Sequence, residues 1–212
     1  MPRPIVIAYH LIWTAYGWWL PNDPRGSTSR TVACPRIAEL GPHYYGRRRV
    51  QPPGRIIDEF YDRAQAVLKF PLLELSAADM AGVAEALGQV VAERRYTCYA
   101  CAIMPDHVHI LIRKHRDNAE QMIEFLQQSS RLRLSSLGLR SPDHPVWTLG
   151  GWKGFLDHPD EVRRKIAYIE GNPGHIGLPE QHWSFVKPYD GWPLHPGHSP
   201  NSPYARRLRN RE

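Results

Sequence analysis

Two histidines separated by one residue form the part of the sequence best suited to chemistry. His107 and His109 lie in the run 104–112, in which every second residue from position 108 onward is aliphatic. These aliphatic residues are Val108, Ile110 and Ile112. In a strand they would share the core face, and the two histidines would share the opposite face, with Cα atoms about 7 Å apart. Two imidazoles at that spacing can bind one metal ion, which could polarise a phosphoryl oxygen. The alternative is a pair of solvated histidines, since the chain has 11 and such a pair can arise by accident.

A tyrosine and an asparagine further along the chain could act beside such a metal. Residues 159–171 predict a helix that begins at Pro159, and Pro173 should end it because the residue before a proline avoids the helical region. Tyr168 and Asn172 are four residues apart, so they share one face at the flank of the buried stripe. The phenol could serve as a nucleophile and the amide oxygen as a metal ligand. Spacing alone favours the simpler interpretation, a tyrosine packed where a helix meets a sheet.

The elements that must hold these residues alternate between strands and helices. The sequence predicts strands at 5–13, about 96–103, about 108–113, near 146–147 and near 152–156, and helices at 57–68, 77–94, 117–137 and 159–171. The order strand, helix, strand, strand, helix, strand predicts an α+β protein with a ferredoxin-like or RRM-like antiparallel sheet packed with helices. This superfold carries many activities, so it says little about function.

Two irregular segments accompany the predicted domain. Residues 14–54 are rich in Gly, Pro, Asn, Asp and Arg and are too long for an ordinary loop, so we expect a long insertion that is a functional flap or partly disordered. A catalytic domain is expected over residues 1–178, and residues 179–212 should form a Pro/His-rich, basic C-terminal tail. The tail, with His182, His195 and His198, either folds back over the site or extends away from it.

The overall charge favours an anionic partner. Lys and Arg number 27 against 21 Asp and Glu in 212 residues, a net charge of +6. Nucleic acid is the commonest anionic partner, although ribosomal, membrane-surface and other basic proteins share such a surplus. No apolar run approaches the about 18 residues of a membrane span, and no signal-peptide pattern is found. We therefore expect a soluble, cytoplasmic protein.

The cysteines are expected to be reduced. Cys98 and Cys101 have C-x-x-C spacing, but residues three apart on a strand point to opposite faces. A shared metal or a disulfide between them is therefore not expected. With Cys34 they are interpreted as reduced core thiols of a cytosolic protein.

Several motifs together resemble a known family. His107-Val108-His109 has the HUH pattern, in which U is a bulky hydrophobe, and follows Met-Pro-Asp. The run Tyr-Ile-Glu-Gly-Asn-Pro at 168–173 comes later, followed by Gly177-Leu178. The runs at 9–14 and 20–26, near the start of the chain, are also part of the resemblance. Over roughly residues 5–178 the chain resembles the single-tyrosine HUH transposases, in particular the branch called REP-associated tyrosine transposases.

This resemblance implies an activity. Tyr168 would be the nucleophile, and His107, His109 and Asn172 would bind a divalent ion, with Mg²⁺ or Mn²⁺ suiting the mixed nitrogen and oxygen ligands, although Zn²⁺ would also bind imidazoles. Attack on a DNA phosphate would give a 5′-phosphotyrosine and a free 3′-OH, and a later 3′-OH would reverse the step without ATP. The absence of a phosphate-binding P-loop agrees with this. The expected partner is single-stranded or hairpin DNA at the nucleoid, and the chain would act as a monomer or homodimer.

Two other functions remain open at this point. One is a non-catalytic module that binds single-stranded DNA or RNA. The other is a metal-dependent phosphodiesterase that uses water, in which Tyr168 is structural.

Candidate DNA contacts are basic residues for the phosphates and tryptophans for unpaired bases. They are Arg47, Arg48, Arg49, Arg131, Arg133, Arg163, Arg164, Lys165, Trp18 and Trp19. Exposed arginines are usually only solvated, and aromatic residues of an insertion often just pack it down. His10, on the first strand, is interpreted as an ordinary hydrogen-bonded histidine and is not assigned to the site.

Overall fold

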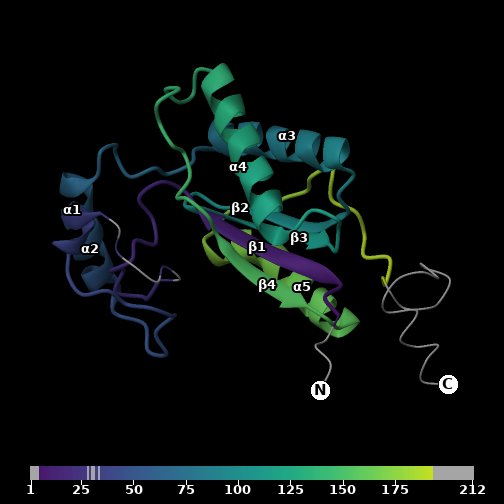
Figure 1. Ribbon diagram of the computed structural model, residues 1–212, viewed down its shortest axis with the longest axis horizontal. Coiled ribbons are helices and arrows are strands. Elements are labelled where there is room, and N and C mark those ends of the chain that lie inside the picture. Colours follow the sequence, from purple (N-terminus) through teal and green to yellow (C-terminus); the bar gives the residue numbers. More distant parts are fainter. Residues whose placement is uncertain (1–4, 28, 30–31, 33, 193–212) are drawn as a thin grey trace.

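A four-stranded antiparallel sheet forms the centre of the molecule in the computed structural model (Figure 1), which describes residues 5–27, 29, 32 and 34–192. The strands are β1 (Ala8–Thr14), β2 (Cys98–Ile103), β3 (His107–Arg113) and β4 (Trp152–Leu156). Their order is β2-β3-β1-β4, and each neighbouring pair is antiparallel. The predicted α+β class with an antiparallel sheet is confirmed. The strand expected near 146–147 is instead a single bridge between Ala15 and Trp147.

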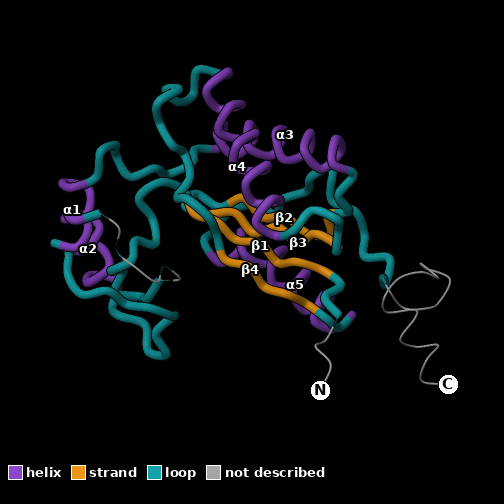
Figure 2. Tube along the Cα trace, viewed as in Figure 1, coloured by secondary structure: helices purple, strands orange, loops and turns teal. Residues whose placement is uncertain are grey.

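Helices cover both faces of this sheet. The helices of the described residues are α1 (Pro35–Ala38), α2 (Gly54–Val67), α3 (Ala77–Arg94), α4 (Ala119–Ser136) and α5 (Pro159–His175), and of these α3, α4 and α5 lie against the sheet. Figure 2 shows α3 and α4 on one face and α5 on the other. Ser76 starts α3 and Asn118 starts α4, each through a reciprocal capping box that satisfies amides left open at a helix start.

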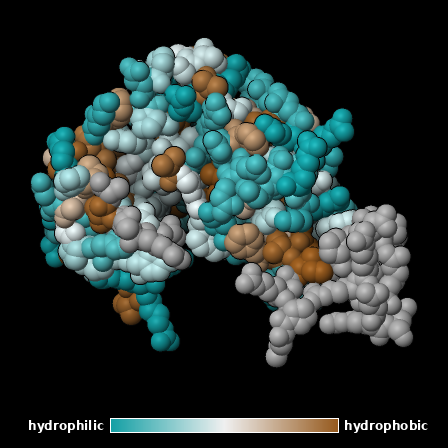
Figure 3. Space-filling view, viewed as in Figure 1, coloured by the Kyte–Doolittle hydropathy of each residue, from teal (hydrophilic) through white to brown (hydrophobic). Residues whose placement is uncertain are grey.

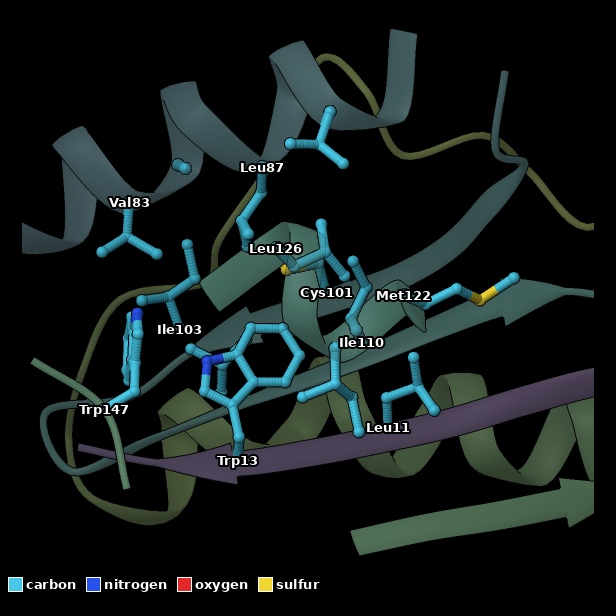
Figure 4. Close-up of a cluster of buried hydrophobic side chains, with 14 of the residues drawn as sticks. Leu11, Trp13, Val83, Leu87, Cys101, Ile103, Ile110, Met122, Leu126 and Trp147 are labelled. Carbon is cyan, nitrogen blue, oxygen red and sulfur yellow. The ribbon is translucent and has the colours of Figure 1, made fainter. Parts of the chain in front are cut away.

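The main core lies between the sheet and helices α3 and α4 (Figure 4). Val108, Ile110 and Ile112 all lie in it, as their alternation predicts. Their neighbours include Leu11 and Trp13 of β1, which alternate in the same way. Each fully buried aliphatic side chain contributes about 1.5–3 kcal/mol to folding. This burial fixes the register of β3 and so turns His107 and His109 toward the α5 face.

The two cysteines of β2 correct one expectation. Cys98 and Cys101 are both fully enclosed in the core on the α3–α4 side, not on opposite faces. The register shifts between Cys98 and Ala100, and such an irregularity inserts a residue and resets the alternation. All three cysteines are free thiols, but only Cys98 and Cys101 are core residues; the expectation of a core position was wrong for Cys34, which is exposed.

Helix α5 also differs from its prediction, because it continues through Pro173 to His175. A proline inside a helix removes one hydrogen bond, here the one to the carbonyl of Ile169. Only the last turn follows Pro173, so little else is lost. Asn172 therefore stays helical and keeps its position one turn after Tyr168. Val162 and Ile169 pack the helix against Leu111 of β3 in a second core.

The segment between β1 and α3 forms a small unit of its own beside the sheet (Figure 1). The sequence predicts an irregular insertion over residues 14–54, but this range contains α1 and packs with α2. Leu20, Leu40 and Phe60 are buried together in a third core. In the space-filling view a hollow lies between this unit and the sheet (Figure 3).

The described part of the C-terminal segment follows the edge strand β2. Gln181 makes two hydrogen bonds to the backbone of Ile103, and the amide of Lys187 donates to the carbonyl of Cys98. His182 is exposed on this segment, whereas His195 and His198 lie outside the described residues. The division of the chain at residue 178 stays a prediction. Within the described ranges, no helix has the length and apolar character to cross a membrane.

Candidate functional site

The two histidines of the HUH motif converge at the start of β3. The Nε2 atoms of His107 and His109 lie 3.0 Å apart, and the two rings are nearly perpendicular. His109 is buried and His107 is partly exposed. The sequence predicted a shared face, and the structure brings the same nitrogen of each ring to one point.

A second polar group contacts each ring at Nδ1, the nitrogen on the other side of the ring from Nε2. Asp106 Oδ1 lies 2.5 Å from His107 Nδ1. His10 Nε2 lies 3.0 Å from His109 Nδ1, because β1 pairs with β3 and places His10 on the same face. Both Nδ1 atoms are thus engaged, which is the arrangement by which proteins orient histidine ligands of a metal.

The buried imidazoles are neutral. Burial, together with the positive charge of Lys165, lowers the pKa of His10 to about 3. Burial, with smaller contributions from His107, His10 and Lys165, lowers the pKa of His109 to about 2. Burial acts to raise the pKa of Asp106, but its hydrogen bond and charge interaction with His107 outweigh this and lower it. A neutral imidazole is the form in which histidine binds metals.

The donor set fits a divalent metal ion. If His107 donates its Nδ1–H to Asp106 and His109 donates its Nδ1–H to His10, both Nε2 lone pairs face one another at 3.0 Å. Two lone pairs at that distance repel unless a cation lies beside them. Nitrogens bound at about 2.1 Å to one ion with a right angle between them are also about 3 Å apart. In the described part of the chain, no group of three or more His, Cys, Asp and Glu side chains is arranged for a metal.

Helix α5 places Tyr168 beside these imidazoles. Its ring centroid lies 5.6 Å from that of His109 and 6.3 Å from that of His10, edge-on in both cases. Tyr168 is 45% exposed, although it is a large aromatic residue. Asn172 donates from Nδ2 to the carbonyl of Tyr168 at 3.0 Å, which anchors its amide one turn away and does not use the amide oxygen.

These residues line a cavity of about 670 Å³ between the sheet, α5 and the unit that contains α1 and α2. His10, His107, His109, Tyr168 and Asn172 all contribute to its wall. None of the described residues that line it is acidic, and Arg47 and Lys165 supply positive charge. The Lys165 ammonium lies 4.9 Å from the centre of the Tyr168 ring. The cavity therefore suits an anionic ligand.

Three of the candidate DNA contacts line this cavity, namely Arg47, Lys165 and Trp19. The structure places the others elsewhere. Trp18 is packed between two cores and donates to the carbonyl of Leu73. Arg48 stacks on Tyr44, Arg131 bonds to the Pro142 carbonyl, Arg133 pairs with Glu85 and Arg163 pairs with Asp160. Arg49 and Arg164 are exposed side chains that do not line the cavity.

His10 and Asp106 join the site, although neither was predicted from the sequence to belong to it. A signal for His10 was present, because it alternates with the core residues Tyr9, Leu11 and Trp13 and so has to face α5. Asp106 precedes the strand, and its contact with His107 depends on the turn that joins β2 to β3. Local periodicity does not predict such a contact.

Comparisons with known proteins give several structural likenesses, two of which are described below. No family model matches the chain, and no curated protein matches it. One similar structure is a REP-associated tyrosine transposase bound to a REP hairpin, with a TM-score of 0.44 and 13% identity over 84% of this chain and 74% of that one. Another is a protein of Deinococcus radiodurans R1 provisionally assigned as a transposase, with a TM-score of 0.38 and 15% identity over 81% of this chain and 94% of that one. Both likenesses are too distant to carry an argument about chemistry, which rests on the side chains themselves.

Proposed function

We propose that this chain is an enzyme that cleaves and rejoins single-stranded DNA with Tyr168 as its nucleophile, as the HUH single-tyrosine transposases that its motifs resemble do. The observation that carries the proposal is the convergence of three groups. The Nε2 atoms of His107 and His109 lie 3.0 Å apart, and the accessible Tyr168 ring lies 5.6 Å from the ring of His109. They share a cavity whose charged lining residues are cationic.

His107, His109 and Asn172 are the residues that would hold a divalent ion, Mg²⁺ or Mn²⁺. When bound, such an ion would withdraw negative charge from an oxygen of the phosphate under attack. Asp106 and His10 hold the two rings so that Nε2 of each remains available. Lys165 and Arg47 add positive charge where the other phosphate oxygens would lie.

The reaction needs no outside energy source. The Tyr168 oxygen forms a bond to phosphorus while the bond from phosphorus to the 3′-oxygen breaks. The phenol loses its proton to solvent, and the departing 3′-oxygen gains one. The products are a 5′-phosphotyrosine and a free 3′-OH, and attack by a 3′-OH on the phosphotyrosine restores an ordinary phosphodiester.

The substrate class follows from the charge and shape of the cavity. A recess of about 670 Å³ lies in the range of small-ligand pockets, which suits an unpaired nucleotide better than a duplex. The motif resemblance adds a hairpin in repeat DNA as the most specific form of the proposal.

A labelling experiment tests the nucleophile. The protein is incubated with Mn²⁺ and a hairpin oligonucleotide with single-stranded flanks, labelled at the 3′ end in one sample and at the 5′ end in another. Attack by Tyr168 should transfer the 3′ label to the protein on a denaturing gel and release the 5′ label as a shorter strand. Tyr168→Phe should remove both products.

The same experiment separates the other functions. Cleavage that gives no adduct and survives Tyr168→Phe would show a phosphodiesterase that uses water. DNA retention without cleavage would show a binding module.

The metal ligands have a separate test. His107→Ala should abolish cleavage and keep most of the DNA affinity measured without divalent metal, because the phosphates are attracted by other residues. His182→Ala, on the exposed C-terminal segment, is the matched control and should keep full activity. Full activity in His107→Ala would refute the metal assignment.

A further inference from the structure

Two tryptophans line the cavity without being part of a hydrophobic core. Trp19 comes from the segment after β1, and Trp152 begins β4. Among the described residues, neither belongs to the three core clusters, whereas the neighbouring Trp18 packs against two of them. Trp152 is 41% exposed. Large apolar rings that remain at the wall of a cavity are available to a ligand.

The Trp19 ring is held firmly in place. Its backbone has a φ of +54°, a conformation that a bulky residue rarely adopts, and its amide donates to the Tyr61 hydroxyl at 2.9 Å. The Arg25 guanidinium lies 3.9 Å from the centre of the indole. Arg25 is fixed in turn by two hydrogen bonds to Asp23, a fully buried carboxylate that also contacts Tyr61. The ring is therefore oriented before any ligand arrives.

Trp152 lies against the sheet close to the histidines. An added Cβ at Gly154 would be 2.6 Å from the indole, so the ring rests over a position that only glycine leaves free. This ring and that of His10 pack edge to face, with centroids 5.5 Å apart. Trp152 is thus next to the proposed metal ligands, and Trp19 comes from the unit that contains α1 and α2.

From these placements, and resting on the proposed function, we infer that Trp19 and Trp152 form a nucleobase subsite. It takes an unpaired base of a nucleotide next to the phosphate that Tyr168 attacks. Arg25 covers one face of Trp19, which leaves its other face for a base. Arg47 and Lys165 line the same cavity and match the adjacent phosphates. Every base has a flat face, so stacking selects an unpaired strand without selecting its sequence.

The test compares DNA with and without bases. The protein carries Tyr168→Phe in every sample, so that binding is measured without covalent capture, and Mn²⁺ is present. One probe is an oligothymidylate of about 12 nucleotides. The other is a sugar–phosphate oligomer of equal length that lacks all bases. The measurement is the Kd of each probe by fluorescence anisotropy.

The subsite predicts that the preference for DNA with bases depends on both tryptophans. The protein with both tryptophans should bind the oligothymidylate about tenfold more tightly than the abasic oligomer. Trp19→Ala and Trp152→Ala should each remove most of this preference and leave the affinity for the abasic oligomer unchanged. Trp19→Phe should retain part of it, and Trp18→Phe, which alters a packing residue, should retain all of it.

The outcomes distinguish the subsite from the proposed function. An undiminished base preference in Trp152→Ala, whose partly exposed side chain can be removed with little effect on folding, would overturn the subsite even if the unmutated protein forms the Tyr168 adduct. Loss of the preference in both alanine variants would support the subsite even if no adduct is ever seen, in which case the proposed cleavage fails alone.

Discussion

At the scale of single residues, the site depends on which ring nitrogen each histidine presents. A neutral imidazole has one donor and one acceptor nitrogen, and the partner of one decides the role of the other. Asp106 engages Nδ1 of His107, and His10 engages Nδ1 of His109. The two Nε2 atoms are thereby left to face one another. His10 acts only through His109, so it is a positioning residue.

His10 can be tested by the metal affinity of the protein. Replacing a residue that orients a metal ligand typically weakens binding about 10–100-fold, so His10→Leu should weaken Mn²⁺ binding by that factor in calorimetry. His10→Gln should restore most of it because an amide can also hydrogen-bond His109. His10→Leu removes the buried Nδ1 of His10, which has no partner, but it also leaves the buried Nδ1 of His109 without its partner, so these two effects oppose each other in the fold stability measured with a chelator present. Equal Mn²⁺ affinity in all three proteins would rule out a positioning role.

The thiols provide a second test at this scale. Burial raises the pKa of Cys98 to about 12 and that of Cys101 well above its ordinary value, whereas Cys34 is exposed. Only the thiolate reacts with disulfide reagents. We expect one thiol per chain to react quickly with such a reagent in native protein and all three in denaturant, as followed by absorbance. Fast reaction of two or three thiols in native protein would contradict the enclosed positions of Cys98 and Cys101.

At the scale of elements, the sequence predicts those features that the local periodicity of apolar residues determines, namely which side chains share a face of a strand or helix. The alternation of Val108, Ile110 and Ile112 with the two histidines predicts both faces of β3, and the four-residue spacing predicts that Tyr168 and Asn172 share a side of α5. The same periodicity fails at Cys98, because the partner strand decides where a bulge forms. It also fails at Pro173, because a proline in the last turn costs too little to end the helix there.

The unit around α1 and α2 could not be predicted for a different reason. Its contacts join residues far apart in the chain, such as the amide of Trp19 and the hydroxyl of Tyr61. Asn22 reaches the carbonyls of Ile37 and Gly41 in the same way. No helical or strand period runs through residues 14–54, so the sequence indicates only an irregular segment. The resulting wall of the cavity, including Trp19 and Arg47, depends on these long-range contacts.

Gly26 tests how this unit is held together. Its φ is +93°, and an added Cβ would lie 1.9 Å from the carbonyl oxygen of Gly46. Gly26→Ala therefore combines an unfavourable conformation, about 1–2 kcal/mol, with a clash against backbone that cannot rotate away. Limited proteolysis should cut residues 14–54 of this variant much faster. Gly138→Ala, also at positive φ but with open space around it, should show only the conformational cost in urea unfolding. Equal rates of proteolysis within residues 14–54 in the two variants would contradict the close approach of Gly26 to Gly46.

At the scale of the whole molecule, the sheet divides the positive charge into two groups. Arg47 and Lys165 lie on the α5 side, in the cavity that the α1–α2 unit closes. Arg131 and Arg133 belong to α4 on the other face (Figure 1), where each already bonds to a protein oxygen. A single strand that reaches Tyr168 has to lie on the first side. The basic residues behind the net charge of +6 should therefore not all attract DNA equally, and we expect the two groups to contribute differently to DNA binding.

This division has a measurable consequence in the salt dependence of binding. Each phosphate neutralised on a single strand contributes about 0.7 to the slope of log affinity against log salt concentration, because a counterion is released. Arg47→Gln and Lys165→Gln should each weaken binding of a single-stranded oligonucleotide and lower the slope by about 0.7, in Tyr168→Phe protein to avoid cleavage. Arg131→Gln removes an equal charge from the opposite face, so it should leave the slope unchanged. A slope that falls equally in all three variants would mean that DNA is attracted by overall charge and not by this cavity.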